Sequence, residues 1–188
     1  MLIPGIAESN TAATQSFQDY QNDGPANAKR QEDYQKILTV LKQYIVAIDT
    51  LDENLYSAAF AEKNAVLSIR DVTRHGREEI KLEITGDKDA RTAREAKAAA
   101  SGEPAPIPVT TFHMMSNSHI VFVDKDHARH NAYYQVYTRP NDHPGGVVRL
   151  TTPITLVAIG RYDDELVKIN GKWFIQHRQI TPDTSGGF

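Results

Sequence analysis

The second half of the chain alternates strand-like segments with turn sequences, and this pattern limits the possible folds more than any other feature. Four segments have strand character, near residues 109–123, 127–139, 149–164 and 172–180. Turn-forming residues separate them at 124–126, 139–146 and 170–171. Asn170-Gly171 between apolar segments is the strongest hairpin signal, because both residues tolerate the backbone angles of a two-residue turn. The pattern predicts an antiparallel meander.

Helical patterns precede this predicted sheet. Apolar residues recur at spacings of three and four, at Ile37, Leu38, Leu41, Tyr44, Ile45 and Ile48. They predict an amphipathic helix from about Lys29 to Thr50, and Asp52 can cap a second, short helix. We expect a strand over 65–72 and a short helix over 76–80. Helices followed by antiparallel strands predict an α+β fold with helices packed on one face of a curved sheet.

The length of the chain predicts a single domain. It has 188 residues, within the range of one hydrophobic core. Residues 1–28 are polar and lack a sustained period, so we expect an N-terminal extension before a domain that covers 29–188. Residues 84–108 are charged and rich in alanine, then rich in proline. They predict an insertion made of a solvated helical piece and an extended arm.

Composition narrows the classes of partner and chemistry. The 21 basic and 24 acidic residues give a net charge of -3, which favours neither a nucleic acid nor an anionic membrane as a partner. No apolar run reaches the ~18 to 20 residues of a membrane span. The absence of Cys excludes thiolate metal sites and a Cys nucleophile. We expect a cytoplasmic location, with a secreted or periplasmic one as the alternative.

Two residues stand out as a candidate acid–base pair. His113 lies early in the first predicted meander strand, with Met115 and Asn117 on the same face by period two, so we expect it to point inward. Asp49 follows Ile48 at the end of the helical stripe, and a buried carboxylate needs a hydrogen-bonding partner. An Asp–His pair would make a useful base. The alternatives are a core histidine bonded to a backbone carbonyl and a solvent-exposed aspartate.

The other histidines have simpler expected roles. We expect His75, His127 and His143 to be exposed to solvent. His127 and His130 should point to opposite faces of a strand, which does not favour a two-histidine metal site. Residues 163–165 are all acidic and predict a solvated strand edge, and we expect Trp173 to pack in the core. Only His113 keeps both an inward direction and a carboxylate partner.

The chain resembles the SnoaL-like branch of the nuclear transport factor 2-like superfamily, which has a cone-shaped α+β fold. Three segments carry this resemblance: 44–67, 110–128 and 160–178. The patterns are most similar to scytalone dehydratase and hexachlorocyclohexane dehydrochlorinase. This resemblance implies that Asp49 and His113 form a catalytic dyad. Thr138 stands where the scytalone enzyme has a second catalytic His, so that part of its machinery differs here.

The resemblance also implies a pocket wall. It puts Tyr162 and Arg178 in the wall and turns Tyr134 and Val136 inward. Asn117, as a hydrogen-bond donor, and Tyr44, on the apolar stripe of the first helix, complete the candidate substrate-binding residues. Three of these have alternatives: Tyr44 as core, Arg178 paired with a surface acid, and Asn117 satisfying the backbone of a bulge.

The predicted function is a cofactor-independent lyase or isomerase of the dehydratase type. Its Asp–His dyad would take a proton from a small hydrophobic cyclic substrate, and the chain would form a homodimer or homotrimer. The alternative is a non-catalytic ligand-binding or assembly module of the same fold, such as an oxygenase small subunit. An open apolar cavity beside the dyad favours the enzyme.

Overall fold

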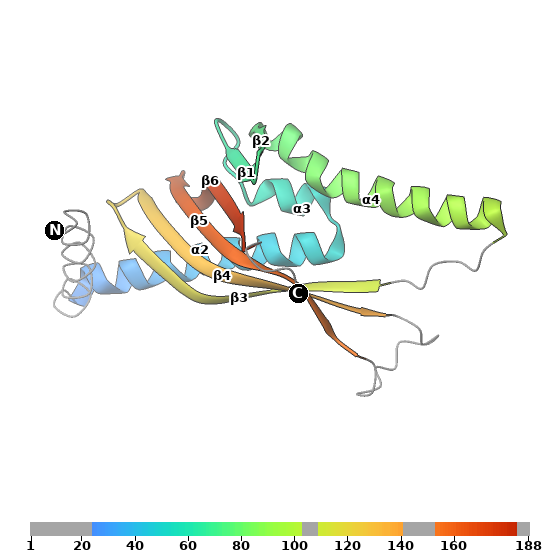
Figure 1. The fold of residues 1–188 in the computed structure, drawn as a ribbon. Helices are drawn as coiled ribbons and strands as arrows, with labels where there is room; N and C mark the ends of the chain where they lie inside the picture. The colour runs from blue at the N-terminus through green and yellow to red at the C-terminus, as the bar shows by residue number, and fades with distance from the viewer. Residues whose placement is uncertain (1–23, 103–108, 141–152, 184–188) are drawn as a thin grey trace, which may run out of the picture.

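The computed structural model describes residues 24–102, 109–140 and 153–183 (Figure 1). The helices are α2 (Gly24–Thr50), α3 (Glu53–Ala58) and α4 (Gly76–Ser101). The strands are β1 (Val66–Ile69), β2 (Val72–His75), β3 (Val109–Phe122), β4 (His127–Pro140), β5 (Thr155–Ile169) and β6 (Lys172–Pro182). The predicted start of β5 near residue 149, and His143, lie outside the described residues.

Six strands form one curved sheet in the order β2-β1-β6-β5-β4-β3. β1 and β6 are parallel, and the other neighbours are antiparallel. α2 contacts β3 and β6, and α3 packs between α2 and α4 (Figure 1). This arrangement confirms the predicted α+β fold, with helices on a curved, mostly antiparallel sheet.

The corner between α2 and α3 is built as its sequence predicts. Leu51 adopts a positive φ of 52°, which ends α2. The Asp52 carboxylate then accepts hydrogen bonds from the backbone amides of Asn54 and Leu55, at 3.1 and 2.9 Å. These amides have no partner within the first turn of α3, so the cap stabilises that turn. α2 itself begins at Gly24, earlier than the predicted Lys29.

The segment after α3 differs from its prediction in two ways. Residues 65–72 do not form one strand, because Arg70 has a φ of 52° and the chain reverses there into the β1–β2 hairpin. The predicted short helix over 76–80 and the helical piece of the insertion are one continuous helix, α4. It ends at Gly102, whose φ of 69° is the left-handed cap conformation that glycine adopts without steric cost.

The turn between β5 and β6 confirms the hairpin prediction. Asn170 and Gly171 have φ values of 51° and 78°, the left-handed pair that a tight turn between twisted strands requires. The turn sets the register in which Ile169 faces Lys172.

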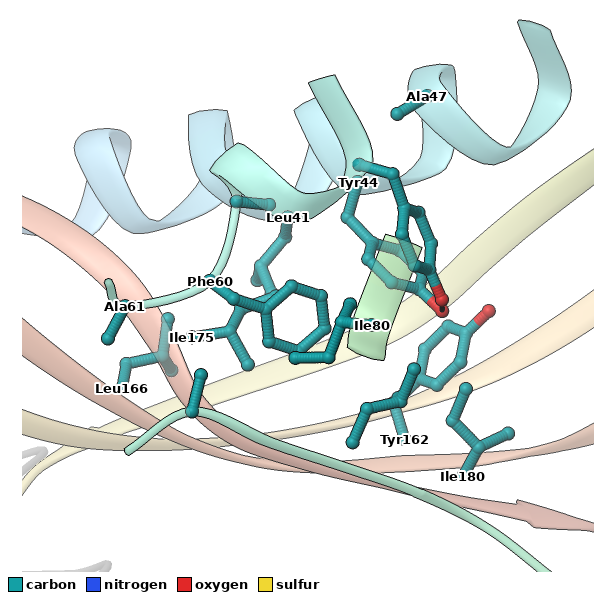
Figure 2. Close-up of a cluster of buried hydrophobic side chains, with 14 of the residues drawn as sticks. Leu41, Tyr44, Ala47, Phe60, Ala61, Ile80, Tyr162, Leu166, Ile175 and Ile180 are labelled. Carbon is teal, nitrogen blue, oxygen red and sulfur yellow. Dashed lines mark hydrogen bonds between the residues drawn. The ribbon is translucent and has the colours of Figure 1, made fainter. Parts of the chain in front are cut away.

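The core lies between the helices and the concave face of the sheet. Leu41 and Tyr44 from α2 meet Ile80 from α4 and Leu166 and Ile175 from β5 and β6 (Figure 2). Each is fully buried or nearly so, and burial of one such side chain stabilises the fold by about 1.5–3 kcal/mol.

Trp173 is buried in this core, as predicted, and its indole N–H donates to Asp33 at 3.0 Å. Lys168 donates to the same carboxylate at 2.7 Å. Asp33 therefore ties α2 to β5 and β6. Among the described residues, no helix is both long and apolar enough to cross a membrane.

Candidate functional site

A cavity of about 560 Å³ opens between the helices and the sheet. Aromatic and aliphatic side chains make up most of its wall: Tyr44, Ile48, Tyr56, Ile69, Val72, Ile84, Tyr134, Val136, Ala158, Tyr162, Ile180 and Pro182. Polar side chains complete the lining: Arg70, Asp71, Arg74, Glu83, Asp87 and His113. A mostly apolar wall with a few polar groups is the usual form of a small-molecule site.

Asp49 and His113 form the predicted contact, with His113 in the lining of this cavity and Asp49 outside that lining. Asp49 lies in the last turn of α2 and His113 on β3, and the Asp49 carboxylate lies 2.6 Å from the His113 ring Nδ1. The same carboxylate accepts the His113 backbone N–H at 3.0 Å. The two side chains are only 24% and 12% exposed. Two bonds to one carboxylate hold both the main chain and the ring of His113 in place.

This contact leaves the second ring nitrogen of His113 available for chemistry. With Nδ1–H donating to Asp49, Nε2 carries a lone pair, and no described residue bonds to it. The Asp49 carboxylate lies at the Nδ1 side of the ring, close to the C-terminal end of α2. The geometry is that of an oriented general base at a cavity wall.

Four tyrosines line the cavity near the dyad. Tyr44 and Tyr56 share a hydroxyl hydrogen bond of 3.1 Å, and Tyr134 stacks on Tyr162 with ring centroids 4.7 Å apart. Figure 2 shows Tyr44 and Tyr162 approaching each other from α2 and from the sheet. Burial raises the pKa of each of the four hydroxyls, and those of Tyr56 and Tyr162 lie well above the ordinary value. All four are therefore protonated at neutral pH. One hydroxyl of the Tyr44–Tyr56 pair donates its proton to the other, so at most three of the four can donate to a ligand.

Gly160 makes room for one of these tyrosines. It faces Tyr134 across the β4–β5 pair, and a Cβ on Gly160 would lie 2.7 Å from the Tyr134 ring and 2.4 Å from the backbone oxygen of Thr181. A larger residue would displace the ring from the cavity wall. A glycine inside a strand is the sequence signal for such a close approach.

Arg178 does not line the cavity. It is fully buried and makes two hydrogen bonds to Asp164, at 2.7 and 2.6 Å. Its guanidinium lies over the rings of Tyr44 and Tyr162, 4.0 and 4.4 Å from their centroids. Arg178 thus lies behind the tyrosine wall and holds it by cation–π contact. Its acidic partner is buried, whereas the sequence suggested a surface acid.

Asp164 and His130 correct two of the predictions. Asp164 is 4% exposed, so the acidic run 163–165 is not wholly a solvated strand edge: alternate residues of β5 point inward, and Asp164 is one of them. His130 is fully buried, and its Nδ1 lies 2.7 Å from Asp164. His113 is therefore not the only inward histidine with a carboxylate partner. Strand alternation from His127 could have indicated the direction of His130.

Asn117 lies on another surface. The alternation that predicted it on the same face as His113 breaks at a bulge between Ser116 and His119, where Asn117 has a φ of 54°. Asn117 is exposed and lines a separate pocket with Tyr133 and Arg161. The bulge alternative describes its position better than the substrate-binding one.

The remaining predicted positions follow strand alternation. Tyr134 and Val136 point inward and line the cavity, and Val136 pairs with His113 across β3 and β4. His75 and His127 are exposed, as predicted, and His127 bonds to Asp124 at the surface. Within the described ranges no group of three or more His, Asp or Glu side chains is arranged to hold a metal ion.

A second cavity adjoins the first. Its volume is about 680 Å³, and it lies between α4 and the beginning of β3. Asp87, Arg91 and Arg94 of α4 line one side, and Thr111 and His113 of β3 line the other. The insertion predicted over 84–108 thus contributes part of a wall beside the dyad.

Comparison with known proteins places the chain in a family. The model of the SnoaL-like domain matches residues 29–179. No curated protein matches the sequence.

Three solved structures share the fold. A protein of unknown function with a cystatin-like fold from Nostoc punctiforme has a TM-score of 0.59 at 22% identity, covering 81% of this chain and 92% of its own. A candidate scytalone dehydratase from Novosphingobium aromaticivorans has a TM-score of 0.60 at 18% identity, covering 84% and 88%. LinA, a hexachlorocyclohexane dehydrochlorinase, has a TM-score of 0.59 at 14% identity, covering 84% and 90%. At these identities the likeness is one of fold.

Proposed function

The chain belongs to the SnoaL-like domain family, and from this premise we propose that it is a cofactor-independent lyase or isomerase of the dehydratase type. The contact between Asp49 and the ring Nδ1 of His113, beside an apolar cavity, carries the proposal. A scytalone dehydratase candidate and a dehydrochlorinase among the proteins of the same fold support this class of reaction.

In the proposed reaction His113 Nε2 takes a proton from a carbon next to a carbonyl. Asp49 holds the ring in the tautomer that leaves Nε2 free and stabilises the imidazolium. The negative charge moves onto the carbonyl oxygen of the substrate. Hydroxyls of the tyrosine wall, formed by Tyr44, Tyr56, Tyr134 and Tyr162, would donate to that oxyanion, because burial keeps them protonated.

The shape of the cavity supports a small hydrophobic cyclic substrate. The stacked rings of Tyr134 and Tyr162 offer a flat apolar face, and Val136 and Ile48 border His113. A flat ring that lies against the tyrosines would place its acidic carbon toward the base. Arg178 takes no direct part in this proposal, because it lies behind the wall.

The test replaces the base and compares it with a matched histidine. We expect His113→Ala to lower kcat/KM on a cyclic β-hydroxyketone by about 10² to 10⁴-fold, the contribution of a positioned general base. His127→Ala is the control, since His127 also bonds to an aspartate but lies at the surface, away from the cavity. It should leave the rate unchanged. Elimination is followed by the ultraviolet absorbance of the unsaturated product.

Two results would contradict the proposal. One is undiminished turnover by a folded His113→Ala protein. The other is a wild-type protein that turns over no member of a panel of cyclic β-hydroxyketones but retains a small molecule detectable by mass spectrometry. The second result would favour the ligand-binding module.

We further propose that the protein assembles as a homodimer or homotrimer. Met114 and Tyr133 are each more than half exposed, at 52% and 53%, on strands that alternate inward and outward. Contiguous apolar patches on a protein surface often mark an interface, and this proposal takes Met114 and Tyr133 as part of such a patch. Light scattering coupled to gel filtration distinguishes a dimer, a trimer and a monomer, and a monomer would refute this assignment.

A further inference from the structure

One face of α4 changes from apolar to charged along its length. Ile80 and Ile84 are buried in the core, and the next residues on the same stripe are Asp87, Arg91 and Arg94. A helix face that continued to pack on a core would continue as apolar residues. Here the charged part faces the second cavity, where α4 extends past α3 toward the beginning of β3 (Figure 1). The charged residues of this helix face therefore form a polar wall of the second cavity.

Asp87 occupies the junction of the two cavities. Four residues line both of them: Ile48, Asp87, His113 and Val136. Two of these are apolar, so Asp87 and His113 are the titratable side chains that face the shared space. Asp87 comes from α4 and His113 from β3, and a small molecule held between these elements can contact both. Asp49 bonds to the Nδ1 side of the ring and is not part of this shared lining.

The carboxyl of Asp87 can exchange a proton with a bound molecule, because it is not engaged in a hydrogen bond within the described part of the chain. No described residue makes a hydrogen bond to it, whereas its neighbour Glu83 accepts a bond from Arg74 of β2 at 2.6 Å. Three ionisable side chains act on the Asp87 carboxyl: Glu83 and Arg94 on α4 and His113 on β3. The residue as a whole is exposed, yet reduced hydration of the carboxyl and the charge of Glu83 raise its pKa, against the opposing effects of Arg94 and His113. A raised pKa keeps the proton on the carboxyl to higher pH.

We propose that Asp87 is the general acid of the reaction and that the substrate therefore carries a hydroxyl leaving group; this rests on the function proposed above. His113 Nε2 takes the proton from the carbon next to the carbonyl. The electron pair of that C–H bond becomes the new C=C bond, and the C–O bond to the hydroxyl breaks. The Asp87 proton moves to the departing oxygen, which leaves as water. Solvent then removes a proton from His113 and returns one to Asp87.

Substrates with different leaving groups distinguish a general-acid role of Asp87 from a structural role. A hydroxide ion leaves poorly unless it is protonated, whereas chloride leaves without a proton. The probes are a β-hydroxytetralone, which dehydrates to a naphthol, and the matching β-chlorotetralone. We expect Asp87→Asn to lower kcat on the hydroxyketone by about 10²-fold or more. Its rate on the chloroketone, above the uncatalysed rate, should be nearly unchanged.

Two further variants make the result specific. Asp87→Glu keeps the acid and should restore part of the hydroxyketone rate. Asp89→Asn removes an exposed carboxylate two residues along the same helix and should affect neither substrate. The pH profile supplies an independent measurement: the wild-type rate on the hydroxyketone should decline at high pH, because the reaction needs protonated Asp87. Asp87→Asn should lose the decline at high pH.

The outcomes distinguish failure of this assignment from failure of the proposed function. If Asp87→Asn loses activity equally on both substrates, or on neither, Asp87 is not the general acid. The comparison of the wild-type protein with His113→Ala still tests the role of His113 as the base. If the wild-type protein turns over neither tetralone, or if His113→Ala is as active as wild type, the proposed function fails and the assignment of Asp87 fails with it.

Discussion

Arg178 is a fully buried cation whose charge one carboxylate balances. Asp164 accepts two of its hydrogen bonds and also bonds to His130, while the third guanidinium nitrogen, Nη1, has no partner among the described residues. The rings of Tyr44 and Tyr162 cover the guanidinium. The tyrosine wall of the cavity therefore depends on a charge pair that lies outside the cavity lining.

Removal of the Asp164 charge should destabilise the fold. We expect Asp164→Asn to lower the free energy of unfolding by about 3–5 kcal/mol, because Arg178 remains buried without its counter-charge. Asp163→Asn is the control: this adjacent residue is exposed and its side chain accepts a bond from Asn131 at the surface, so its effect should stay below about 1 kcal/mol. Urea denaturation measures both, and equal losses would show that the buried pair is not important.

At the scale of elements, two glycines have opposite roles. Gly171 lies in the β5–β6 turn with a φ of 78°, while Gly86 lies inside α4. A Cβ at either position would meet no atom within 4 Å. Alanine at these positions therefore changes only the backbone preference and not the packing.

The two substitutions should shift stability in opposite directions. Gly171→Ala should cost about 1–2 kcal/mol, since an L-residue avoids the left-handed conformation. Gly86→Ala should stabilise by up to about 1 kcal/mol, because alanine restricts the unfolded chain and favours the helix. Thermal unfolding followed by circular dichroism gives both values. A shift of the same sign for both variants would contradict the assigned backbone conformations.

At the scale of the whole molecule, two buried carboxylates connect distant parts of the chain. Asp33 links α2 to Lys168 and Trp173, and Asp164 links β5 to β4 and β6. Burial alone would raise the pKa of both groups. The bonds from Lys168 and Trp173 to Asp33, and the charge and bonds of Arg178 and His130 at Asp164, hold each pKa below its ordinary value.

These lowered pKa values predict the response of the fold to acid. The stabilisation is complete above the unfolded-state value near pH 4 and is lost as the pH falls through the lower folded-state values. The free energy of unfolding, from urea titrations at a series of pH values, should therefore fall below about pH 4. Asp33→Asn should make this fall shallower, and Asp71→Asn, at an exposed position, should leave it unchanged. An equal slope in all three proteins would exclude Asp33 as a cause.

The sequence alone determined the features that depend on local chemistry. The apolar stripe predicted α2, the carboxylate of Asp52 predicted the cap of α3, and Asn170-Gly171 predicted the β5–β6 turn, because each depends on side chains only a few residues apart. Helices followed by strand segments predicted the α+β fold. The pairing of Asp49 with His113 was one of the alternatives that the sequence offered: strand alternation predicted the direction of His113, and the family resemblance joined it to Asp49.

Only the tertiary structure decided which polar groups are buried and which face they occupy. The bulge near Asn117 reverses the strand alternation and turns this residue away from His113, and such a bulge depends on pairing with β4. His130 and Arg178 lie 34 and 14 residues from Asp164, so their burial depends on strand register that no local pattern specifies. Asp87 lines the same cavities as His113 because α4 continues past the core. Each of these features arises when distant segments pack together, since burial and charge pairing are properties of the assembled fold.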